Sequence, residues 1–341
     1  MKKILYTLLM VSLFSVACTE EVLVSRDHDL DAEIAEIETK MTMKTLYCNI
    51  NESVAVELGQ LGSYLTAKDA DVVKLVAPAT VSGESFVSWL EGYAAETGYM
   101  AMSRTNKNGK LVMAALVKNA YSEVTAEYVV REDPPLNNAV LLFSVDKFYF
   151  VVTEMNKARN AIPSDWAEQV AAMLKNHKTV PLVYDPDQLA ERQAEMDYLI
   201  DQTLDNEKFS SVKYWVWSLD TNAPSNIDMK YGKEFKLVDC YDNVDEEAFI
   251  KKHHSYFAVS EYLSADDAYF KVNDMLVYAG MVDCLAVQHS VYTPSSSDGN
   301  RHNFLYTSDD VWNIIQSIEL DKSVEWNAMH YPIVVTLKEE E

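Results

Sequence analysis

The sequence predicts an α+β protein built from antiparallel sheets with packed helices, arranged as two lobes. Helical and strand-like segments interleave irregularly along its 341 residues. Two stretches, 98–119 and 139–152, each contain two strand-like runs around a turn, which is the pattern of a β-hairpin. Apolar residues make up 48% of the chain, enough for a packed core.

The first lobe is expected over residues 44–184. Its second helix is predicted between an N-cap at Ser82 and a terminating Gly98, because Phe86 and Leu90 lie on one face of that segment. The second hairpin is expected to turn at 145–147. The remaining elements follow from apolar spacing: a helix over 53–65, and strands over 71–78, 121–130 and 179–184.

A connecting helix is expected over residues 185–210, because Asp185 can cap it and Pro186 suits a first helical turn. The second lobe then covers residues 211–341. Its principal predicted elements are strands over 212–219, 281–292 and 331–338, and helices over 265–280 and 309–318.

The N-terminus has the three parts of an export signal. Two lysines precede an apolar segment that is too short to span a bilayer, and small residues lead to Cys18. This arrangement resembles the lipobox of bacterial lipoproteins of the Bacteroidota type. The resemblance implies removal of the signal peptide 1–17, acylation of Cys18 with fatty acids such as palmitate, and an acidic tether over 18–43. An ordinary secretory signal with an incidental cysteine is the alternative.

The resemblance also implies a location. Cys18 would anchor the chain to the outer membrane, and its acyl chains would make the anchor effectively permanent. Glu20 and Glu21 resemble the acidic signal that sends some such lipoproteins to the cell surface, although they also suit a solvated tether. We therefore expect the cell surface rather than the periplasmic face.

Residues 58–90 carry a second resemblance. Their helix, strand and helix pattern is similar to the N-terminal cap module of BspA-like surface proteins. No leucine-rich repeat follows this segment, so the repeat surface of that family is absent. The resemblance implies a small helix–strand–helix element and brings no functional residue with it.

The charge of the chain is strongly acidic. Asp and Glu number 53 against 29 Lys and Arg, which gives a formal net charge of −24. No basic stripe is present to neutralise phosphates, so we expect no nucleic-acid partner. The nine glycines form neither GxGxxG nor GxxxxGK[ST], which disfavours a glycine-rich phosphate loop.

The cysteines leave two possibilities open. Cys240 and Cys284 could form a disulfide in an oxidising compartment, or they could be buried thiols like Cys48. No Cys or His spacing typical of a metal site appears, and the sequence predicts no metal and no cofactor.

Aromatic residues provide a candidate binding surface. Trp215 and Trp217 lie on one face of the strand predicted over 212–219, where they could stack on sugar rings. The alternative is that both tryptophans are buried in the core, which is the commoner position for large aromatic residues.

The function expected from these features is a non-catalytic, surface-exposed binding or adhesion module with a glycan or protein ligand. No catalytic residue is assigned, because no catalytic motif appears. One alternative is a periplasmic or surface hydrolase whose site is assembled from distant histidines and nearby acids. Its histidines would be drawn from His253, His254, His289 and His302. A structural component of an outer-membrane assembly is a third possibility.

Overall fold

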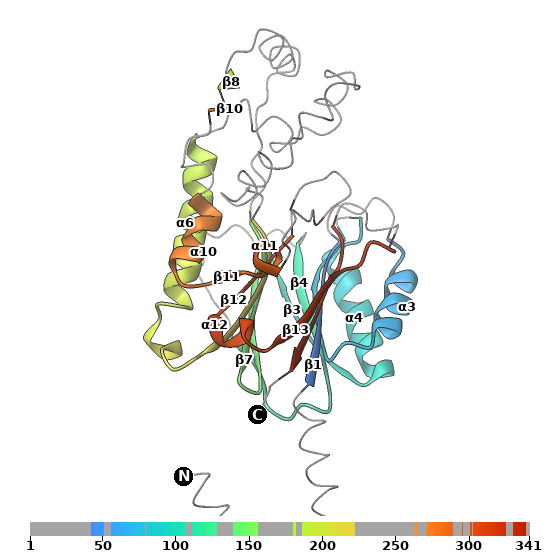
Figure 1. The fold of residues 1–341 in the computed structure, drawn as a ribbon. Coiled ribbons are helices and arrows are strands. Elements are labelled where there is room, and N and C mark those ends of the chain that lie inside the picture. Colours follow the sequence, from blue (N-terminus) through green and yellow to red (C-terminus); the bar gives the residue numbers. More distant parts are fainter. Residues whose placement is uncertain are drawn as a thin grey trace, which may run out of the picture. The chain divides into compact units, whose positions relative to one another are not determined.

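Two six-stranded sheets form the framework of the computed structural model (Figure 1). Apart from Thr42, the elements belong to one compact unit that runs from Met43 to Glu340. The structure describes residues 42–50, 56–78, 80–106, 111–127, 139–155, 180–181, 186–221, 263–264, 271–288, 295, 301, 303–324 and 330–338.

The first sheet has the strand order β13-β14-β1-β2-β4-β3. Strands β1 and β2 are parallel, whereas β2, β4 and β3 pair in antiparallel fashion, as do β13 and β14. The bounds are β1 Thr42–Asn49, β2 Val72–Val76, β3 Tyr99–Thr105, β4 Val112–Lys118, β13 Ile315–Leu320 and β14 Ile333–Lys338.

The second sheet has the order β11-β12-β9-β7-β6-β5, with β7 and β9 parallel and the other neighbouring strands antiparallel. Its strands are β5 Val124–Glu127, β6 Val140–Val145, β7 Phe148–Glu154, β9 Tyr214–Asp220, β11 Val282–Asp283 and β12 Asn303–Thr307. Two further short strands, β8 Val180–Pro181 and β10 Leu263–Ser264, pair in parallel. Each large sheet therefore combines strands from residues 44–184 with strands from residues 211–341.

The core between the two sheets is apolar and comes from alternate residues of their strands. Val72 and Val76 of β2 face Phe150 and Val152 of β7 across this layer, in one cluster with Val216 of β9. Because side chains alternate between the two faces of a strand, this cluster defines the inner face of each sheet.

Helices cover the outer faces (Figure 1). Helices α3 Leu58–Lys68 and α4 Gly83–Thr97 pack on the first sheet through a buried cluster that includes Leu61, Leu90 and Leu75. Helices α6 Pro186–Gln202 and α10 Lys271–Tyr278 pack on the second sheet with Trp217 and Phe304. The short helices are η1 Glu207–Phe209, α11 Cys284–Gln288 and α12 Asp309–Trp312.

Several local predictions are confirmed. Ser82 accepts a hydrogen bond from the backbone N–H of Ser85 and begins α4, which ends at Gly98 with φ 78°. Both hairpins form, and Asp146 has φ 50° at the turn of the second. The predicted α+β class is also confirmed, although both large sheets are mixed because each contains one parallel pair.

Two predicted elements differ from the structure. Within the described part of the strand expected over 281–292, residues 281–288, the strand ends at Asp283 and α11 follows, because Asp283 Oδ1 accepts from the N–H of Ala286 and starts that helix. The helix expected over 309–318 ends at Trp312, because the residues from Ile315 onward pair with β14.

The export signal, Cys18 and the predicted acidic tether up to residue 41 lie outside the described residues, so lipid anchoring at the outer membrane stays a prediction. The last two residues of the predicted tether, Thr42 and Met43, instead begin β1. The part of the chain that the structure describes contains no helix long and apolar enough to cross a membrane.

Candidate functional site

Four polar residues stand at the ends of otherwise apolar strands. Asn49 is the last residue of β1, Glu154 the last of β7 and Asp220 the last of β9, while Asn303 is the first of β12. All four are buried, with at most 3% of their surface exposed. We call them the edge cluster.

Strand alternation places the edge cluster on the inner faces of the sheets. Glu154 follows Val152 by two positions, and Asn303 precedes Leu305 by two, and both of these apolar residues belong to the core between the sheets. Asp220 is in register with Glu154 on one side and with Asn303 on the other. Two carboxylates and one carboxamide therefore form a row across three neighbouring strands.

Asn49 completes the edge cluster from the opposite sheet. Its Nδ2 donates to Asp220 Oδ2 at 3.5 Å, although the two residues are 171 positions apart in the sequence. At the same level of the first sheet, Asn49 is in register with Val76, which pairs with Met113. The first sheet thus presents an apolar wall with one amide, and the second sheet carries the acids.

Tyr47 lies one step deeper, in the field of both acids. Burial raises the pKa of its hydroxyl well above the usual value, and the negative charges of Asp220 and Glu154 raise it further. The hydroxyl therefore stays protonated at neutral pH and can only act as a neutral group. Among the described residues it has no hydrogen-bond partner.

Lys74, in register with Tyr47 on β2, forms the floor beneath the edge cluster. Its Nζ donates to Ser218 Oγ at 2.9 Å, and Ser218 lies two residues before Asp220 on the same face of β9. Burial lowers the pKa of Lys74 from 10.5 to about 7. Lys74 therefore loses its positive charge as the pH rises through neutrality.

Ser295 connects the two sides of the edge. Its Oγ accepts from the backbone N–H of Asn303 at 3.0 Å, and its carbonyl oxygen accepts from the N–H of Tyr331 at 2.8 Å. His330, which is also buried, immediately precedes Tyr331. This contact brings the segment that contains His330 next to the start of β12.

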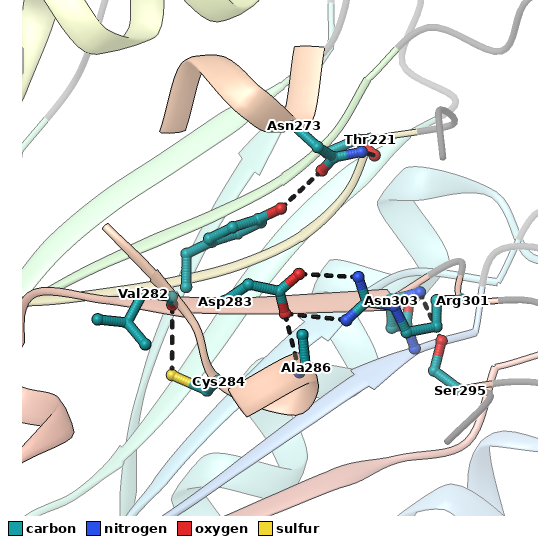
Figure 2. Close-up of polar contacts among 10 residues, drawn as sticks. Thr221, Asn273, Val282, Asp283, Cys284, Ala286, Ser295, Arg301 and Asn303 are labelled. Atoms are coloured by element: carbon teal, nitrogen blue, oxygen red, sulfur yellow. Dashed lines mark hydrogen bonds and ion pairs between the residues drawn. The ribbon is translucent and has the colours of Figure 1, made fainter. Parts of the chain in front are cut away.

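Two polar networks support the second sheet beside the site (Figure 2). Asp283 and Arg301 form a buried two-point ion pair with distances of 2.9 and 2.7 Å, just before β12. Asn273 of α10 contacts Thr221, the residue that follows Asp220. The first network lies two residues before Asn303 and the second lies next to Asp220, so each stabilises the backbone near one member of the edge cluster.

The edge cluster consists of oxygen-rich side chains, which is the ligand type that Mg²⁺ prefers. Glu154 and Asp220 supply carboxylates, and Asn303 supplies an amide whose oxygen and nitrogen have no hydrogen-bond partner among the described residues. Over the same residues no group of three or more His, Cys, Asp or Glu is placed to hold a metal. The cluster therefore fits a cation that takes one or two carboxylates and completes its shell with substrate or water.

The tryptophans proposed for stacking are core residues. Trp215 is 4% exposed and Trp217 is 0% exposed. They pack between the second sheet and its helices, and the Trp215 ring lies 5.3 Å from that of Tyr149. Burial is the alternative that the structure supports, so no ligand ring can stack on them.

Of the proposed Cys240–Cys284 pair, the structure describes only Cys284, so the bridge stays a prediction. Cys284 is buried and forms no bridge to a described cysteine; its Sγ lies 3.1 Å from Thr307 Oγ1, and burial raises its pKa to about 12. Cys240 lies outside the described residues. The histidines of the hydrolase alternative, His253, His254, His289 and His302, do so as well.

No member of the edge cluster was predicted as a site residue from the sequence. A usable signal was present, because three buried strands end in a polar residue: TLYCN, FVVTE and VWSLD. A buried polar residue at the end of an apolar strand is unusual unless it has a partner or a function. His330 has no neighbouring histidine and belongs to no recognised motif, so the sequence does not indicate it.

Comparison with known proteins gives the fold. No family model and no curated protein matches the sequence. The chain is similar to the solved structure of a 3′ phosphatase, NExo from Neisseria bound to a product DNA hairpin, at 13% identity and a TM-score of 0.57, over 87% of this chain and 100% of that one. A structure titled as the 3′–5′ exonuclease NExo from Neisseria meningitidis matches at 15% identity, a TM-score of 0.55 and the same coverage.

An AP endonuclease from Archaeoglobus fulgidus also matches, at 13% identity and a TM-score of 0.52, over 86% of this chain and 99% of that one. All three structures are named as enzymes, and each is covered over almost its whole length. The expectation of a non-catalytic binding or adhesion module is therefore wrong. The hydrolase alternative is the better interpretation, with a site different from the histidine set that suggested it.

Proposed function

We propose that the protein is a phosphoester hydrolase whose active site is the edge cluster. The observation that carries the proposal is the row of Glu154, Asp220 and Asn303 on adjacent strand ends, faced by Asn49 from the other sheet. The fold shared with a 3′ phosphatase, an exonuclease and an AP endonuclease supports the phosphoester class.

The side chains suit the charges of this reaction. One carboxylate of the edge cluster accepts the proton of the attacking water. Asn303 Nδ2, which is buried and has no partner among the described residues, donates to a phosphoryl oxygen. Tyr47 adds a neutral hydroxyl, because its raised pKa keeps the proton in place. A divalent cation held by the other carboxylate would supply charge neutralisation at the phosphoryl group.

The net charge of the whole chain bears on the substrate. A protein with a formal charge of −24 repels a long polyanion, and nucleic-acid affinity depends on phosphate neutralisation by Lys and Arg. We therefore propose a small phosphoester as substrate and retain the prediction that nucleic acid is not a partner.

Hydrolysis by the full-length chain tests the proposal. p-Nitrophenyl phosphate and bis(p-nitrophenyl) phosphate represent monoesters and diesters, each assayed with Mg²⁺, with Mn²⁺ and with EDTA. We expect one ester to be hydrolysed and Asp220→Asn to lower kcat about 100-fold or more, because the proton acceptor or cation ligand is lost.

Asp201→Asn is the matched control, because Asp201 is exposed on α6, which packs on the outer face of the second sheet, whereas the edge cluster lies on the inner face. Its rate should equal that of the wild type. A fully active Asp220→Asn variant, or a wild type inactive on both esters under all conditions, would overturn the proposal. A 3′-phosphorylated oligonucleotide in the same assay tests the substrate class, and its preferred cleavage would contradict the small-substrate prediction.

A further inference from the structure

Asn273 joins three elements of the structure just outside the edge cluster. Its Nδ2 donates to Thr221 Oγ1 at 3.0 Å, and its Oδ1 accepts from the hydroxyl of Tyr306 at 3.0 Å. All three residues are 0% exposed. Figure 2 shows Asn273 on its helix next to Thr221 at the end of β9. The amide therefore links α10, β12 and the residue that follows Asp220.

The contact acts where the strand pairing of β9 ends. The last residue pairs of β9 are those of Asp220 with Glu154 and with Asn303. One backbone hydrogen bond extends further, from the N–H of Met155 to the carbonyl oxygen of Asp220 at 2.8 Å. Beyond this bond, the hydrogen bond from Asn273 to the side chain of Thr221 anchors the end of β9 to α10.

The carboxamide of Asn273 is held at both ends. Its Oδ1 accepts from the Tyr306 hydroxyl while its Nδ2 donates to Thr221, so loss of the Tyr306 hydroxyl leaves one end of the amide less restrained. Tyr306 lies on the outer face of β12, three residues after Asn303, with its ring in the core beneath the helices. The chain Tyr306–Asn273–Thr221 thus runs along the back of the row of acids.

We propose that Asn273 is a positioning residue for Asp220, which it holds in its reactive orientation through Thr221. This inference depends on the proposed function, because it assigns Asp220 a role in hydrolysis. Active-site carboxylates need placement within about 0.5 Å, which residues in contact with the backbone of the site supply. A purely structural Asn273 would change stability without changing the rate of the folded enzyme.

Two variants and one control test the proposal. Asn273→Ala removes both hydrogen bonds of the amide, and Tyr306→Phe removes only the hydroxyl that bonds its Oδ1. Tyr278→Phe is the matched control, because Tyr278 is 83% exposed at the end of the same helix and loses the same group. Tyr306→Phe keeps the ring in the core, so it is informative even if Asn273→Ala does not fold.

The first readout is amide hydrogen exchange at Met155, followed by NMR, which requires no activity. We expect exchange about tenfold faster in Tyr306→Phe, with the amide of Val151 in the middle of β7 unchanged. The second readout is steady-state kinetics at 25 °C on folded protein, where kcat should fall about tenfold and KM should stay within about twofold. Tyr278→Phe should match the wild type in both.

The outcomes separate this inference from the proposed function. Unchanged exchange at Met155 in both variants overturns the anchor, whatever the activity. Faster exchange with an unchanged kcat shows an anchor that does not position Asp220 for the reaction, which also overturns the inference. An inactive wild type refutes the proposed function and with it the catalytic purpose of Asn273, while the exchange data still report on the anchor.

Discussion

Replacing Lys74 with methionine is expected to raise the free energy of unfolding near pH 6 and to change it little near pH 10. Lys74 is fully buried in β2, and its Nζ lies 2.9 Å from Ser218 Oγ and 5.5 Å from the centroid of the Phe150 ring. Among the described residues no carboxylate pairs with it. The hydroxyls of Ser218 and of Thr45, whose Oγ1 lies 3.4 Å from Nζ, and the aromatic ring replace water around the ammonium group, which does not compensate for its desolvation.

The magnitude follows from the pKa of Lys74, which burial lowers from 10.5 to about 7. Between these two values the unfolded chain holds a proton that the native protein lacks, so stability rises with pH across this window and is lowest below pH 7. At about 1.36 kcal/mol for each pKa unit, the full difference is roughly 5 kcal/mol. Loss of the hydrogen bond to Ser218 offsets about 1 kcal/mol, so we expect a gain of about 4 kcal/mol near pH 6.

Urea denaturation of the wild type and Lys74→Met at several pH values between 6 and 10 measures this difference. The advantage of the variant should shrink steadily above pH 7 as the wild-type amine becomes neutral. Lys338→Met serves as the control, because Lys338 is exposed at the end of β14 and its replacement should show no such trend. A difference that is independent of pH, or that grows with pH, would refute the reasoning.

Two further predictions concern buried carboxylates. Asp283→Asn should lower the free energy of unfolding by about 3–5 kcal/mol, because Arg301 would remain as a buried charge; a loss below about 1 kcal/mol in urea denaturation would contradict this. Burial alone would raise the pKa of Asp321, but hydrogen bonds from Lys68, Ser323 and Tyr64 outweigh it and lower the pKa to about 2. Asp321 therefore contributes about 2 kcal/mol above pH 4, and this is lost as the pH falls from 4 through 2. Thermal unfolding of Asp321→Asn should accordingly differ from the wild type at pH 7 and converge with it near pH 2, and a constant difference would argue against the Asp321 contacts.

Much of the fold could be predicted from local patterns. The N-cap at Ser82, the left-handed Gly98 and the turn at Asp146 are decided by residues a few positions apart. The prediction failed where a contact with a residue distant in the sequence decides the local structure. Residues from Ile315 onward carry apolar spacing that also suits a helix, but pairing with β14 makes them a strand. Asp283 begins a helix while its carboxylate also binds Arg301, eighteen positions away.

In the candidate site too, local sequence decides some features and contacts between distant residues decide the others. Each member of the edge cluster is visible in the sequence as a polar residue at one end of an apolar run. Nothing in the sequence indicates that β1 faces β9, since Asn49 and Asp220 are 171 positions apart. The adjacent histidines and the paired tryptophans are neighbours in the chain, whereas a catalytic site depends on residues that are neighbours in space.

The sequence by itself determined the secondary-structure class, the caps and turns, the apolar alternation of the strands and the acidic charge, because each depends on composition or on contacts within one element. Only the tertiary structure decided the parallel pairing of β7 with β9 and the facing of the two sheets. These arrangements bring Glu154, Asp220, Asn303 and Asn49 to one edge. The reason is that strand pairing joins residues through backbone hydrogen bonds that are the same for every side chain, so the choice of partner depends on how the whole core packs.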